Sequence, residues 1–95
     1  MEKVRSYSGL FIITPDKNED LDDVKNSING VINENSGTIV NENMIGKRTL
    51  AYPIKKKEEG IYYEVDFKAD AKSITKMSRL FRINVDILRA LIDKK

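Results

Sequence analysis

The alternation of apolar and polar positions along the chain predicts four strands and two helices. The clearest strand covers residues 61–68, where Ile, Tyr, Val and Phe on one side alternate with Tyr, Glu, Asp and Lys on the other. Another strand is expected at 7–14, where aromatic and β-branched residues are dense and Pro15 ends the run. Its apolar centre indicates a position inside the sheet, and a short final strand is expected at 87–92.

Two stretches repeat apolar residues at helical spacing. In the first, the polar segment 16–20 is expected to be the start of the helix, and glycine at position 37 is expected to supply the left-handed conformation that ends it. The apolar positions of this helix are Leu21, Val24, Ile28, Val31 and Ile32. The second helix is shorter and is expected over 71–81.

The strand expected at residues 38–51 has mixed faces. Positions 38, 40, 42 and 44 would face one way and positions 39, 41, 43 and 45 the other, and neither set is purely apolar. This pattern is typical of an edge strand, which we expect to bend or bulge at Gly46 and to stop at Pro53, because proline lacks the N–H that a ladder needs. A turn at 55–60 would follow.

The resulting order βαββαβ favours an α+β, ferredoxin-like fold over a single domain of residues 1–95. In this topology two helices cross over onto one face of a four-stranded antiparallel sheet. The second and fourth strands lie at the edges. The other face of the sheet stays available to solvent, RNA or protein.

Composition and charge narrow the class of protein. The chain is 40% hydrophobic and 34% charged, which is a globular composition, and it contains no cysteine, which excludes disulfides and thiolate zinc sites. Residues 1–44 carry four Lys/Arg and eight Asp/Glu, whereas residues 45–95 carry thirteen and seven, so a positive surface is expected in the second part. The N-terminus lacks an apolar signal core and no run reaches membrane-spanning length, so we expect a cytoplasmic protein.

Catalytic chemistry finds little support. The chain has neither histidine nor cysteine, and the acidic pairs at 22–23 and 58–59 are adjacent in sequence, so their side chains diverge. No enzyme activity, cofactor, metal or small-molecule substrate is therefore expected. Base stacking by tyrosines is also disfavoured, because the strand at 60–67 places acids where single-strand RNA modules carry small or apolar residues.

The most informative stretch is the basic run at residues 46–57, GKRTLAYPIKKK. It places Lys47 and Arg48 on the outward side of an edge strand and adds a lysine cluster at 55–57, which we interpret as a solvated turn. Clustered cations attract phosphate. From the residues alone, both a solvated edge and a phosphate-binding site remain open.

Separated blocks of the chain resemble the bacterial small-subunit ribosomal protein six family. They are GKRTLAYPI at 46–54, GIY at 60–62, FRIN at 81–84 and ILR at 87–89, preceded by an Arg-x-Tyr opening at 5–7. The resemblance implies a structural RNA-binding protein of the cytoplasmic ribosome. It would bind the central domain of small-subunit ribosomal RNA together with small-subunit ribosomal protein eighteen and support subunit assembly and translation.

The resemblance also implies roles for individual residues. The RNA-binding candidates are Arg5, Tyr7, Lys47, Arg48, Arg82 and Arg89. The candidates for the interface with protein eighteen are Leu50, Tyr52, Pro53 and Ile54, whose apolar members are also expected to shape the edge strand.

Two other classes of function remain as alternatives. One is a non-ribosomal ferredoxin-like module that binds single-stranded RNA, and the other is a protein-interaction domain that associates through an edge strand. Salt dependence separates them from a complex based on phosphate contacts, because such a complex weakens steeply as salt rises.

Overall fold

The computed structural model describes residues 4–94 and contains a four-stranded antiparallel sheet in the order β2-β3-β1-β4. Its elements are β1 (Val4–Ile13), the 3-10 helix η1 (Pro15–Asp20), α1 (Leu21–Glu34), β2 (Thr38–Ile54), β3 (Lys57–Asp70), α2 (Ala71–Ile83) and β4 (Ile87–Lys94). β2 and β4 are the edge strands. The predicted ferredoxin-like α+β fold, with β1 inside the sheet, is confirmed.

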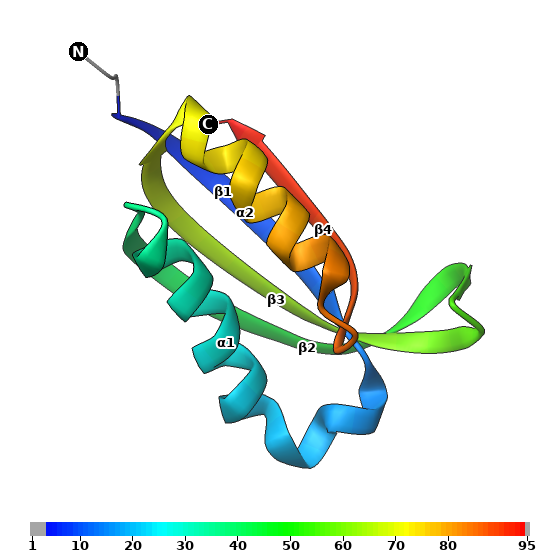
Figure 1. The fold of residues 1–95 in the computed structure, drawn as a ribbon. Coiled ribbons are helices and arrows are strands. Elements are labelled where there is room, and N and C mark those ends of the chain that lie inside the picture. Colours follow the sequence, from blue (N-terminus) through cyan, green and yellow to red (C-terminus); the bar gives the residue numbers. More distant parts are fainter. Residues whose placement is uncertain (1–3, 95) are drawn as a thin grey trace.

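Both α helices lie on the same face of the sheet (Figure 1). The core lies between the helices and the sheet. There the Phe11 and Phe81 rings pack edge to face, with 4.7 Å between their centroids, and Tyr63 and Phe67 are buried. Tyr63 and Phe67 belong to the apolar side of the alternation predicted over residues 61–68, and this side faces the core. Within residues 4–94, no helix is long and apolar enough to cross a membrane.

The first helix forms where the apolar spacing predicts it, with Val24, Ile28 and Ile32 buried against the sheet. Its expected ending is wrong in one detail. Ser36, and not Gly37, takes the left-handed backbone conformation, with φ 65°. Gly37 is required for another reason, since a Cβ at this position would lie 2.5 Å from Cγ2 and 2.8 Å from the carbonyl oxygen of Ile32. The chain therefore leaves the helix through a contact that only glycine allows.

The strict alternation expected along β2 is also wrong. The pairing of β2 with β3 shifts between Ile39 and Asn41 and again between Met44 and Gly46, so Ile39 and Met44 both pack on the core. Each shift inserts a residue and reverses which side chains face the helices. The bend expected at Gly46 is confirmed, since its φ is 111°.

β2 does not stop at Pro53 but continues to Ile54, and β3 begins at Lys57, so the expected turn at 55–60 shrinks to Lys55 and Lys56. Proline is accommodated because it lies on an edge strand, in the stretch between Thr49 and Ile54 where the ladder with β3 is interrupted. β1 likewise begins earlier than expected, at Val4.

A hydrogen-bonded group fastens edge strand β2 to α1. The Glu42 carboxylate accepts hydrogen bonds from the Tyr63 hydroxyl and from Nδ2 of Asn29, both at 2.6 Å. Those two donors, Tyr63 first, lower the pKa of Glu42 below its ordinary value of 4.5. Burial, followed by the contact with Glu42, raises the pKa of Tyr63, so its hydroxyl remains a donor.

Substitution of two glycines by alanine should change stability in opposite directions. Gly37→Ala should lower the free energy of unfolding by about 1–3 kcal/mol, because the methyl group collides with Ile32. Gly30→Ala should raise it by about 0.5–1 kcal/mol, because Gly30 lies inside α1 and a Cβ there meets no atom within 4 Å. Urea unfolding of both variants measures the effects, and shifts of the same sign would contradict this interpretation.

The link between Glu42 and Tyr63 should make stability depend on acid pH. A carboxyl whose pKa is lowered by folding contributes fully above its unfolded pKa and loses that contribution as the pH falls through its folded pKa. Tyr63→Phe should therefore cost about 1 kcal/mol at neutral pH and less in strong acid, when Glu42 is protonated. Urea unfolding between about pH 3 and pH 7 measures this. A cost that does not vary with pH would show that the carboxylate is not involved.

Candidate nucleic-acid interface

The hairpin formed by β2 and β3 extends beyond the two helices (Figure 1). A small apolar cluster seats it on the helix-free face of the sheet, where Leu50 packs with Ile12 and Leu88 and all three are buried. Ile12 pairs with Tyr62 on one side and Arg89 on the other, so these side chains lie next to each other on that face. The cluster thus brings the hairpin beside β4.

A hollow of about 270 Å³ opens where the hairpin turn, the end of α2 and β4 meet. Its walls are formed by Lys55, Ser78, Phe81, Arg82, Ile87, Leu88, Arg89 and Ala90. Three of these residues are cations with exposed side chains, and none of the wall residues carries a carboxylate. The structure therefore brings together two predicted RNA-binding residues, Arg82 and Arg89, in a setting that favours an anion.

Arg89 also connects the two sets of predicted site residues. Its Nη1 donates a hydrogen bond to the Tyr52 hydroxyl at 3.2 Å. Tyr52 is 62% exposed, and its hydroxyl lies beside Arg89 in the wall of the hollow. A ligand at the hollow and a protein on the hairpin would therefore lie close together.

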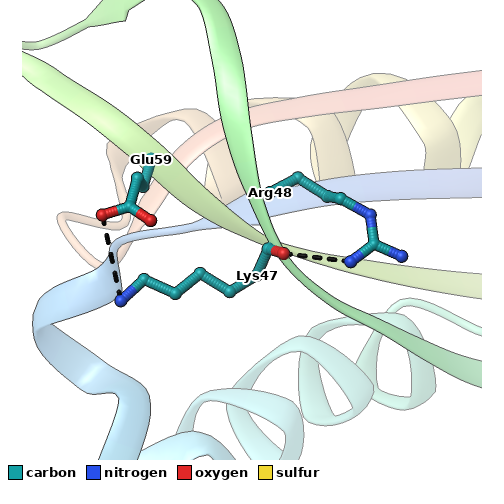
Figure 2. Close-up of polar contacts among 3 residues, drawn as sticks. All are labelled: Lys47, Arg48 and Glu59. Carbon is teal, nitrogen blue, oxygen red and sulfur yellow. Dashed lines mark hydrogen bonds and ion pairs between the residues drawn. The ribbon is translucent and has the colours of Figure 1, made fainter.

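Lys47 and Arg48 leave β2 in opposite directions and do not line the hollow (Figure 2). Nζ of Lys47 lies 3.9 Å from a carboxylate oxygen of Glu59, and Nη1 of Arg48 donates to the Lys47 carbonyl at 3.0 Å. Both side chains are exposed, as expected, but the expectation that they share the outward side of the strand is wrong. Their RNA-binding role stays a prediction, and adjacent strand positions explain why one surface cannot contain both.

Arg5 and Tyr7 lie near the start of β1, at the end of the sheet away from the hairpin turn. Tyr7 is only 7% exposed, and its ring stacks on Phe67 at 5.9 Å. This placement leaves little of the ring for a ligand. Arg5 is exposed, and its RNA-binding role also stays a prediction.

The predicted partner block divides into seating and surface residues. Leu50 is buried and Ile54 half-buried in the cluster that seats the hairpin, whereas Tyr52 and Pro53 are exposed. The exposed members border a shallow, mainly apolar hollow of about 200 Å³ that also includes Thr49, Ala51 and Glu58. The expectation that apolar members shape the strand is thus confirmed for Leu50.

The lysine cluster at 55–57 is not uniform. Nζ of Lys57 donates to a carboxylate oxygen of Asp16 at 2.7 Å, and this hydrogen bond and the charge of Lys57 lower the pKa of Asp16. Lys55 instead lines the cationic hollow, beside residues of α2 and β4. Its interpretation as a solvated turn residue was therefore incomplete. The pairing of Ile54 with Lys57 leaves a turn of only two residues, and this register is seen only in the structure.

Metal chemistry has no candidate in the described part of the chain, where no group of three or more acidic side chains is placed to hold an ion. The expectation of no cofactor stays an expectation.

The family described as ribosomal protein S6 matches residues 6–94. The chain belongs to the ribosomal protein S6 family. Small ribosomal subunit protein bS6 of Helicobacter acinonychis is 38% identical over 94 residues, covering 96% of this chain and 65% of that protein, so the chain spans slightly less than two thirds of that relative's length. The bS6 protein of Halalkalibacterium halodurans is 37% identical over 92 residues, covering 96% of this chain and 97% of the relative.

The crystal structure of 30S ribosomal protein S6 from Thermotoga maritima has a similar fold, with a TM-score of 0.90 and 28% identity over 98% of this chain and 89% of that chain. The resemblance stated from the sequence blocks is thus confirmed. Members of this family are structural proteins of the small ribosomal subunit and not enzymes.

Two substitutions on the hairpin should distinguish the buried residue that packs it on the sheet from an exposed residue on its surface. Leu50→Ala should lower the free energy of unfolding by about 2 kcal/mol or more, because it removes a buried side chain from the contact with Ile12 and Leu88. Tyr52→Ala, two residues away, should change it by less than about 0.5 kcal/mol, since the ring is exposed. Urea unfolding gives both values. Equal costs would mean that Leu50 does not seat the hairpin.

Proposed function

We propose that this chain binds the central domain of small-subunit ribosomal RNA together with small-subunit ribosomal protein eighteen, and that it supports subunit assembly in this way. The carboxylate-free hollow that joins Arg82 to Arg89 is the observation that carries the proposal. Guanidinium groups form paired hydrogen bonds with phosphate oxygens, so two of them at one hollow suit a folded RNA backbone.

The fold supports the placement of both arginines. Arg82 lies in the last turn of α2, where the helix dipole favours a cation, and Arg89 lies on edge strand β4. Packing between α2 and the sheet fixes their separation, since Phe81 and Ile87 are both buried in the core. The backbones from which the two charged side chains extend are therefore fixed relative to each other before RNA arrives.

The hairpin is the surface that we assign to protein eighteen. Tyr52 and Pro53 are exposed there, beside a shallow apolar hollow, and Tyr52 is hydrogen-bonded to Arg89. Exposed aromatic residues are favoured at protein interfaces. A partner bound to the hairpin would thus contact Arg89, which is also assigned to RNA. We therefore expect the binding of RNA and the binding of protein eighteen to be coupled.

Membership in the ribosomal protein S6 family favours this function over the two alternatives. A module that stacks bases on its open sheet would need exposed rings along the central strands. β1 and β3 instead place serine, glutamate and aspartate on much of the helix-free face, at Ser8, Glu64 and Asp66. These positions offer no rings for base stacking, so this face of the central strands does not match such a module.

Replacement of both hollow arginines tests the proposal. Arg82→Ala combined with Arg89→Ala should weaken binding to a central-domain RNA fragment, with protein eighteen present, by about tenfold or more. The slope of log affinity against log salt should become shallower by about 1.5, because two phosphate contacts are lost. Filter binding over a salt series measures both quantities.

Lys68→Ala combined with Lys76→Ala is the matched control, since it removes two exposed cations that lie outside the hollow. This variant should bind RNA nearly as well as the wild type. If both double variants bind equally well, the hollow is not the RNA site. If the wild-type chain shows no affinity for the RNA with protein eighteen present, the proposed function itself is wrong.

A further inference from the structure

The hairpin turn has an unfavourable backbone for the residues it contains. Its two central residues, Lys55 and Lys56, both have positive φ, at 50° and 67°. Two-residue hairpin turns of this kind strongly prefer Asn-Gly, because glycine and asparagine adopt the left-handed conformation at little cost. Lysine at both positions is therefore a strained choice, and strained backbone is concentrated at functional sites.

Lys55 is the member of this turn that reaches the cationic hollow. It meets Arg82 and Arg89 there, although the three residues come from three different elements. Among the side chains that the structure describes, neither Lys55 nor Arg82 lies within 4.0 Å of a carboxylate, whereas the nearby Lys57 is paired with Asp16. Within residues 4–94, the charges of Lys55 and Arg82 are thus not balanced by an ion pair with a carboxylate.

A neutral hydroxyl completes the donor set. Ser78 lies on α2 one turn before Arg82 and is half-buried in the wall of the hollow. Together the walls offer an ammonium, two guanidinium groups and a hydroxyl, all of which can donate hydrogen bonds to an anionic oxygen. The apolar wall residues Phe81, Ile87 and Leu88 reduce local hydration and so strengthen these interactions.

We propose that Lys55 completes a binding site for a single RNA phosphodiester with Arg82 and Arg89, and that the strained lysine turn is kept for this contact. The proposal rests on the proposed function and adds to the RNA site Lys55, which the sequence analysis interpreted as part of a solvated turn. The hairpin turn then contacts RNA as well as positioning the partner surface.

The turn supplies its own matched pair of variants. Lys55→Asn and Lys56→Gly each remove one positive charge and each place a favoured residue in the turn, but only Lys55 lines the hollow. Both variants should raise the thermal unfolding midpoint by about 2–6 °C. Only Lys55→Asn should weaken binding to the central-domain RNA fragment with protein eighteen, by about three- to tenfold, and make the salt slope shallower by about 0.7.

Lys55→Arg should retain the affinity, because it keeps the charge at the hollow. A gain of stability in both variants, with a loss of affinity in Lys55→Asn only, would support the proposal. A residue with a purely structural role in the turn would not lose affinity while the protein gained stability. Wild-type affinity in Lys55→Asn, or an equal loss in Lys56→Gly, would overturn it. Either result would leave the roles of Arg82 and Arg89 intact, whereas failure of the proposed function would appear as loss of RNA binding by the wild type.

Discussion

Strand β1 pairs along both of its edges, and the arrangement of the whole molecule depends on this pairing. It binds β3 from Val4 to Ile13 and β4 from Tyr7 onward, so one strand sets the register of both halves of the sheet. Alternation along β1 then divides the two faces: Phe11 points into the core under the helices, and Ile12 points to the helix-free face. A register slip of one residue would exchange these faces, which is why the dense apolar centre of β1 is a strong constraint.

Ile12 shows how this pairing produces a site. On the helix-free face it packs with Leu50 from β2 and Leu88 from β4, two segments that are far apart in sequence. The β1–β4 pairing shifts at Ile12, and this irregularity leaves Leu88 on the helix-free face and Arg89 beside it. A small apolar cluster outside the main core thereby brings the hairpin turn, with Lys55, to the arginines of α2 and β4. The hairpin's binding surfaces depend on packing rather than on sequence proximity.

The sequence predicted the elements with regular periodicity and failed where local exceptions decide the geometry. Residues 61–68 alternate cleanly and formed the central part of β3, and the spacing of Val24, Ile28 and Ile32 predicted α1. Along β2, two register shifts cancelled the expected alternation, because an edge strand with one partner tolerates extra residues. At the end of α1 the expected glycine role was wrong, since Gly37 avoids a collision while Ser36 adopts the left-handed backbone. Such exceptions depend on contacts between residues that are distant in the chain, and a single sequence does not show which residues are in contact.

Charge at the candidate site also depends on contacts that the sequence does not show. The basic run at 46–57 suggested a binding surface from the number of its cations, yet their environments differ. Lys47 lies near Glu59 and Lys57 is bonded to Asp16, so part of their charge is balanced within the protein. Lys55 joins Arg82, which lies 27 positions further along the chain, in walls without a carboxylate. Affinity for an anion depends on charge that remains unbalanced and is held in place before binding, so the partners of each lysine are more informative than the length of the run.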